Sequence, residues 1–226
     1  MRDSYKQLFA SGLITKDQLF MFGLSETIYV DTKTAEDEWE SLKNQIQSGK
    51  KVFIRGFGRD ASGTHLFQKF YSHLIGNHKV AKDSTNNAEP TKLLREWTGY
   101  SKSGGKQFKP IRNYQISHVF GKTKNVYCFT APWNIVYLPK IIDPFTGHEA
   151  KGAYVDEYTQ LFQKETFKRF RALIEDFNQI VTGSEFQAKI RTAIELMSYE
   201  EEFTPKDINK LENAIKTEFS PINENA

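Results

Sequence analysis

The chain has 226 residues, of which 26% are charged, 38% are hydrophobic and 14% are aromatic, and its formal net charge is +3. This composition is ordinary for a soluble globular protein and leaves room for a sizeable core. No apolar run approaches the roughly 20 residues that a transmembrane helix requires, so we expect no membrane partner. Charges interrupt the apolar stretch at the N-terminus, which argues against a signal peptide. The single cysteine, Cys128, excludes an internal disulfide and fits the reducing cytoplasm, where we expect the protein to lie.

The first fifty residues predict an N-terminal helical segment. Thr34 has the position of a helix cap, with an acid three residues later. Trp39, Leu42 and Ile46 then recur at helical spacing, and Gly49 ends the pattern. Before this helix the pattern is weak, with short apolar pieces only.

Residues 51–152 predict an α/β core of short strands. Residues 51–55 form a buried strand in this interpretation, followed by a glycine-bearing turn and a helix that Gly76 ends. A polar stretch with one short helix precedes an expected strand pair, residues 114–120 and 126–138, with a break at the Pro132–Asn134 turn. Residues 77–83 look barely like a strand.

Residues 153–226 predict a helical C-terminal region. Phe162, Phe170, Ile174 and Phe177 belong to one helical stripe that runs up to Gly183, and further helices follow. We therefore expect the α+β class, with three segments: 1–50, 51–152 and 153–226.

Four polar residues between positions 113 and 152 are surrounded by apolar ones. His118 ends an apolar run, Asn134 follows in a turn, and Asp143 and His148 lie in one short connection. A neutral imidazole can take a proton from water, and an amide can fix its orientation. Carboxylate oxygen and imidazole nitrogen are competent ligands for Mg²⁺, Mn²⁺ or Zn²⁺.

The order His118, Asn134, His148 resembles the motif of the HNH, or ββα-metal, endonuclease family. The context Trp133-Asn-Ile-Val-Tyr-Leu-Pro-Lys140 is similar to the strand and turn that follow the family's asparagine. The resemblance covers about forty residues and implies His118 as general base, Asn134 as the orienting amide, and Asp143 and His148 as metal ligands. In one respect the sequence departs from the family, because Ser117 stands where an acid or histidine is common.

Two other interpretations remain open. Asp143, Glu149 and Lys151 have the spacing of the PD-(D/E)xK nucleases, although that fold places the last two on a strand. In the second interpretation, Gly56 and Gly58 match the glycine-rich turn of a nucleotide-binding module. A lone match of that kind is a weak signal, and close packing of a strand–helix turn explains it better.

Basic residues flank the polar cluster, as a polyanionic partner requires. They are Arg55, Arg59, Lys102, Lys106, Lys109, Arg112, Lys122, Lys124 and Lys140. The resemblance therefore implies a metal-dependent endonuclease on double-stranded DNA, with Mg²⁺ first among the metals. We expect a sequence-specific enzyme of the type II restriction class, acting as a homodimer on a palindromic target.

Overall fold

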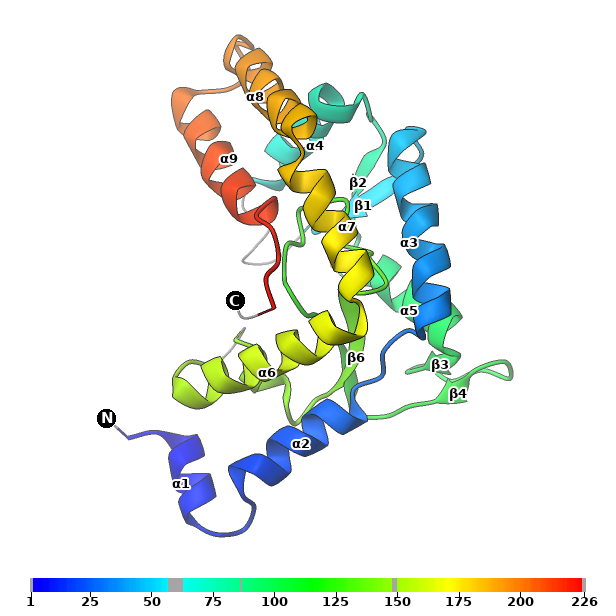
Figure 1. Cartoon of the computed structure of the whole chain (residues 1–226), viewed down its shortest axis with the longest axis vertical. Coiled ribbons are helices and arrows are strands. Elements are labelled where there is room, and N and C mark those ends of the chain that lie inside the picture. The colour runs from blue at the N-terminus through cyan, green and yellow to red at the C-terminus, as the bar shows by residue number, and fades with distance from the viewer. Residues whose placement is uncertain (1, 57–62, 86, 148–149, 225–226) are drawn as a thin grey trace.

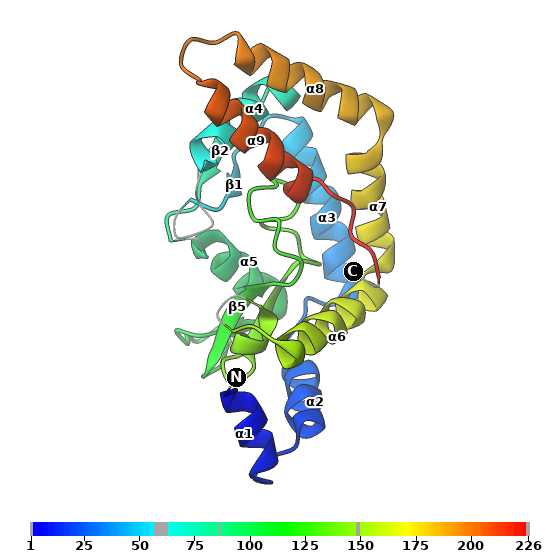
Figure 2. The same ribbon diagram turned by 90° about the vertical axis from the view of Figure 1, so that its left-hand side faces the viewer.

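The computed structural model describes residues 2–56, 63–85, 87–147 and 150–224, and its fold is of the α+β class. The helices are α1 (Ser4–Ala10), α2 (Lys16–Glu26), α3 (Thr32–Gln47), α4 (Thr64–Ile75), α5 (Ala88–Thr98), the short 3₁₀ helix η2 (Asp143–Thr146), α6 (Ala153–Arg169), α7 (Arg171–Thr182), α8 (Ser184–Ser198) and α9 (Pro205–Glu218). Helices α1 and α2 lie at one end of the long axis and α8 and α9 at the other, with α6 between them (Figures 1 and 2). Within these described ranges, no helix is long and apolar enough to cross a membrane.

The strands form three separate two-stranded sheets within the described residues. Two are parallel, β1 (Val52–Ile54) with β2 (Val80–Lys82) and β3 (Tyr100–Ser101) with β4 (Lys109–Pro110); the third is antiparallel, β5 (Tyr114–His118) with β6 (Ile135–Pro139). In the third sheet His118 lies opposite Ile135. Helix α4 connects β1 to β2, as a parallel pair requires a crossover.

Two hydrophobic clusters hold the elements together, and each draws on all three predicted segments. The larger one contains Trp39 of α3, Trp133 just before β6, and Phe177 of α7. The ring of Trp133 packs against the other two, at centroid distances of 5.7 Å to Trp39 and 5.4 Å to Phe177. The smaller one contains Phe20 of α2, Val136 of β6, and Tyr158 and Phe162 of α6. Within the described residues, both clusters therefore connect the three segments.

Several predicted elements are confirmed. Helix α3 carries Trp39, Leu42 and Ile46 on its buried face, α4 ends at Gly76 in the left-handed conformation, and α6 to α9 make the C-terminal region helical. The cap of α3 is Asp31, whose carboxylate accepts the N–H of Thr34, so the helix starts two residues before the expected cap.

Other expectations were wrong in detail. The second strand of the pair begins at Ile135, because residues 126–134 form buried turns and not an extended chain. The C-terminal stripe is divided at Phe170 into α6 and α7. The weakly patterned N-terminus contains α1 and α2, and the doubtful strand near Val80 is β2.

Candidate functional site

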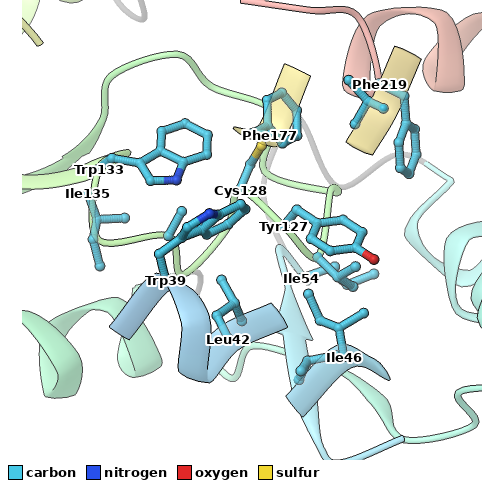
Figure 3. Packing of buried hydrophobic residues seen from close by; sticks show 14 of the residues in the cluster. Trp39, Leu42, Ile46, Ile54, Tyr127, Cys128, Trp133, Ile135, Phe177 and Phe219 are labelled. Atoms are coloured by element: carbon cyan, nitrogen blue, oxygen red, sulfur yellow. The ribbon is translucent and has the colours of Figure 1, made fainter. Parts of the chain in front are cut away.

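The candidate site is built on the connection between β5 and β6, residues 119–134, which we call the site loop. Its apolar residues are anchored in the core: Tyr127 and Cys128 lie close to side chains of α3, and Trp133 packs beside Trp39 (Figure 3). Burial raises the pKa of the Cys128 thiol well above its ordinary value, so this residue is an inert core side chain and not a thiolate nucleophile.

Asn134 holds the two ends of the site loop together. Its side-chain oxygen accepts the N–H of Phe120 at 2.9 Å, and its amide donates to the carbonyl oxygens of Gly121 at 3.0 Å and Cys128 at 2.9 Å. Both amide hydrogens are therefore directed at the backbone and not at His118. Asn134 thus fixes the shape of the loop, which differs from the direct orientation of the imidazole that the resemblance implies.

His118 ends β5 and is buried, with 6% of its surface exposed. Its Nε2 lies 3.0 Å from the carbonyl oxygen of Phe129, and its ring stacks on the ring of Phe129 at 5.2 Å. A carbonyl oxygen can only accept, so Nε2 carries the hydrogen and the lone pair of the neutral ring is on Nδ1. The site loop therefore fixes the orientation and the tautomer of His118.

Helix α6 connects the end of β5 to η2. Gln163 donates to the carbonyl oxygen of Val119, the residue after His118, at 3.1 Å. Thr159, four residues earlier on the same helix, donates to the carbonyl oxygen of Phe145 in η2 at 3.0 Å. Residues four apart are separated by about 6 Å along a helix. The end of β5 and η2 therefore meet α6 within about one helical turn of each other.

Asp143 is the first residue of η2 and is half-buried. His148, the second expected metal ligand, and Glu149 lie outside the described residues. Among the ranges that the structure describes, no three His, Cys, Asp or Glu side chains are grouped so that they could hold a metal ion. Ser117, which precedes His118, is buried with its hydroxyl unpaired among those residues.

A family sequence profile described as "Uncharacterised protein PM1201" matches residues 30–224. The chain belongs to the PM1201 family. A relative from Pasteurella multocida (strain Pm70), "Uncharacterized protein PM1201", is 36% identical over 219 residues, which are 96% of this chain and 92% of the relative. No solved structure matches the chain. The profile covers the candidate site together with the helices α3 to α9.

Seven of the nine predicted basic residues of this PM1201 family member divide into two groups; Arg55 follows β1, and Arg59 lies outside the described residues. Those that lie near the β3–β4 pair and the outer end of the β5–β6 sheet are exposed: Lys102, Lys106, Lys109, Arg112 and Lys140. Partial burial and the cation of Lys140 lower the pKa of Lys102, which indicates that these two charges are neighbours. The β3–β4 connection extends away from the body (Figure 1).

The second group lies on the site loop and contacts α9. Lys122 donates to the carbonyl oxygen of Thr217 at 2.7 Å and to the hydroxyl of Ser220 at 2.6 Å, and burial lowers its pKa. The cation of Lys124 lies 5.9 Å from the ring centroid of Phe67 in α4. Lys122 therefore has a structural role, which differs from the expected contact with DNA.

The glycine-bearing turn after β1 is only partly described, because Gly58 and Arg59 lie outside the described residues. A Cβ on Gly56 would lie 2.8 Å from the carbonyl oxygen of Asp83, so close packing requires glycine there. Asp83 follows β2, where a nucleotide-binding fold has its acidic residue, but its carboxylate accepts the N–H groups of Thr85, Ala88 and Glu89 at the start of α5. Packing therefore accounts for Gly56, and capping of α5 accounts for Asp83.

The alternative nuclease pattern places Lys151 on a strand. In the structure Lys151 is exposed in an irregular segment immediately before α6, and its partner Glu149 is not described. This arrangement does not favour the PD-(D/E)xK interpretation.

Proposed function

We propose that this protein is a metal-dependent endonuclease that hydrolyses DNA phosphodiester bonds, with His118 as the general base. The observation that supports this most strongly is the bonding of α6 to both Val119 and Phe145. It gives the order strand, strand, helix that the HNH resemblance implies, and it brings η2 close to the end of β5. The candidate base and Asp143 therefore belong to one corner of the molecule.

The fixed imidazole suits the role of a general base. Its Nε2 hydrogen is bound by the carbonyl oxygen of Phe129, so Nδ1 is the nitrogen that accepts a proton from water. Stacking on the ring of Phe129 restricts rotation of the imidazole. A base held in one tautomer and one orientation requires little rearrangement before the reaction.

Asp143 and His148 are the residues that we propose as ligands of a divalent cation. One carboxylate and one imidazole fit a hard or borderline ion, and we propose Mg²⁺, with Mn²⁺ and Zn²⁺ as the alternatives that such ligands also accept. When bound, this ion neutralises charge on the phosphate and the leaving oxygen. The Asp143 main-chain carbonyl accepts the hydroxyl of Thr146 at 2.7 Å, which stabilises the turn that presents the carboxylate.

The exposed basic group is the surface that we propose for the DNA backbone. Lys102 and Lys140 are neighbouring cations, and a phosphate between them would relieve their repulsion. The rings of Tyr100 and Phe108 lie against the cations of Lys109 and Arg95, at 5.9 and 5.1 Å. These contacts stabilise the base of the β3–β4 connection and keep its positive charge on one side.

The type II restriction class, a homodimer and a cytoplasmic location complete the proposal. A palindromic target would be met by two copies related by a two-fold axis. The free, buried Cys128 is compatible with a reducing compartment. A nucleotide-binding module is the second candidate, and the β1–α4–β2 unit favours it.

The test is incubation of the purified protein with supercoiled plasmid, with Mg²⁺ and with EDTA. The proposal predicts linear or nicked plasmid with Mg²⁺ and intact plasmid with EDTA. Intact plasmid under both conditions, together with a rise in melting temperature on adding ATP or NAD, would replace the nuclease by the nucleotide-binding module. The outcome on several plasmids of different sequence tests the restriction class.

A further inference from the structure

The turn that positions Phe129 depends on a buried asparagine that the sequence analysis did not single out. Asn125 is fully buried, and its backbone oxygen accepts the N–H groups of Cys128 and Phe129, both at 2.9 Å. Its side-chain oxygen accepts the N–H of Tyr127 at 2.9 Å. Asn125 therefore sets the position of the residue whose carbonyl binds His118.

The C-terminal end of α9 holds Asn125 from the other side. The amide of Asn125 donates to the backbone oxygen of Glu218 at 2.8 Å, and the Glu218 carboxylate accepts the N–H of Lys124 at 3.0 Å. Lys122 adds the bond to the carbonyl oxygen of Thr217. Residues more than ninety positions apart in the chain are thus joined at the turn that leads to Phe129.

The backbone is strained at Lys122, where the chain enters this turn. Gly121 and Lys122 both have positive φ, at 63° and 52°, and a side chain is unfavourable in that conformation. Lys122 keeps it while its ammonium group is bound to Thr217 and Ser220 of the C-terminal segment. The α9 contacts therefore stabilise a turn that the loop would not favour alone.

Two further elements hold the same turn. The hydroxyl of Tyr71 in α4 donates to the carbonyl oxygen of Lys124 at 2.7 Å and accepts the N–H of Val126 at 3.1 Å. After β1, the N–H of Arg55 donates to the carbonyl oxygen of Thr123 at 2.9 Å. The turn is therefore fixed from three sides, and α9 is the side that bonds to the Asn125 side chain.

We propose that Asn125 and Glu218 are positioning residues for His118, and that α9 is a necessary part of the active site. The amide of Asn125 donates to the backbone oxygen of Glu218, the N–H of Phe129 donates to the backbone oxygen of Asn125, and Nε2 of His118 donates to the carbonyl oxygen of Phe129. The catalytic meaning of this arrangement rests on the proposed function, whereas the effect of α9 on the orientation of His118 does not.

The test uses the full chain and compares Glu218→Ala, Glu218→Gln and Asn125→Ala. Glutamine retains an acceptor for the Lys124 N–H, and alanine does not. Glu218→Gln should therefore match the natural protein in both readouts below, whereas Glu218→Ala should differ from it. The matched control is Asn178→Ala. Asn178 binds the same C-terminal segment through both the N–H and the carbonyl of Ile222, at 2.8 Å each, and its side chain forms no hydrogen bond with the site loop within the described residues.

The first readout is the ¹⁵N–¹H signal of the His118 Nε2–H, measured by NMR together with its exchange with water. The proposal predicts that exchange accelerates about tenfold or more in Glu218→Ala and Asn125→Ala, and stays unchanged in Asn178→Ala. The second readout is single-turnover cleavage, which should fall about 10–100-fold in the first two variants at unchanged DNA affinity. If Asn125→Ala does not fold, Glu218→Ala decides.

An unchanged exchange rate in folded Glu218→Ala would overturn the proposal. If the natural protein cleaves no DNA and Glu218→Ala still shows accelerated exchange, the nuclease proposal is rejected. The link from α9 to His118 is then retained. Equal losses in Asn178→Ala and Glu218→Ala would mean that the C-terminal segment acts through general stability, and this too would overturn the positioning role.

Discussion

The carbonyl oxygen of Phe129 lies 3.0 Å from Nε2 of His118, and the ring of Phe129 stacks on the same imidazole. One residue therefore sets both the tautomer and the plane of the candidate base. Because this contact is made by main chain, no substitution at position 129 removes the acceptor. The residues that shape the site loop are consequently the ones whose loss should change the behaviour of His118.

Asn134→Ala tests this view of the loop. The substitution removes the partners of the buried Cys128 carbonyl and of the partly buried Phe120 N–H and Gly121 carbonyl, and an unsatisfied fully buried group costs about 1–3 kcal/mol. We expect the free energy of unfolding to fall by about 2–4 kcal/mol, measured by urea denaturation. Cleavage by the folded fraction should also fall, and Asn134→Ala should add nothing to the loss in His118→Ala. Full additivity of the two rate losses would contradict a shared role.

Asp143→Ala tests the metal ligand. We expect cleavage to be lost because affinity for the cation falls, so millimolar Mn²⁺ should restore part of the rate that Mg²⁺ does not. His148→Ala should behave in the same way. The measurement is the cleavage rate as a function of metal concentration. If Lys151→Ala abolishes cleavage and His148→Ala is tolerated, the PD-(D/E)xK interpretation replaces this one.

The two groups of basic residues should respond differently to substitution. Lys109→Ala with Arg112→Ala should weaken DNA binding at every sequence and reduce the slope of log affinity against log salt by about 1–2. Lys122→Ala is the control, because its ammonium group binds the carbonyl oxygen of Thr217 and the hydroxyl of Ser220. It should lower the melting temperature and leave the salt slope unchanged. Fluorescence anisotropy across a salt series measures the DNA affinity and its salt slope. Equal slopes in the natural protein and both variants would remove the β3–β4 surface from the interface.

Glu218 gives a prediction for the pH dependence of stability. Burial raises its pKa above the ordinary value near 4.5, against the opposing bonds and charges of Lys124 and Lys122. A carboxyl group with a raised folded pKa favours folding most below its unfolded pKa, and this contribution is lost as pH rises through the folded pKa. Glu218→Gln carries no charge, so its stability relative to the natural protein should increase from pH 4.5 to pH 7.5. A difference that stays constant or falls over this range would contradict the raised pKa.

Much of the helical architecture could be predicted from local patterns, and the turns of the site could not. The apolar run from Val126 to Leu138 predicts a strand, because a buried strand and another buried segment both appear in the sequence as a continuous apolar run. In the structure its first part forms turns, since Asn125 and Asn134 bind backbone groups that a strand would pair with its neighbour. Burial was predicted correctly there, and the conformation was not.

Two other features lay outside what periodicity can show. Helix α2 has little amphipathic character, and a capping box of Thr15 and Gln18 stabilises its N-terminus. The contacts of Gln163 with Val119 and of Glu218 with Lys124 join residues 44 and 94 positions apart. Local patterns identified His118 and Asp143 as candidates, and long-range contacts decide which elements support them.

The central claim is that His118 removes a proton from water during DNA cleavage, and one variant tests it most directly. Single-turnover cleavage and the thermal midpoint should be measured on the same sample of His118→Ala, in Mg²⁺ and with saturating protein. A general base contributes about 10²–10⁴-fold, so the rate should fall by about that factor while DNA affinity is retained. The result that would contradict the account is a lowered thermal midpoint with a normal cleavage rate from the folded fraction, because His118 would then be a packed strand residue.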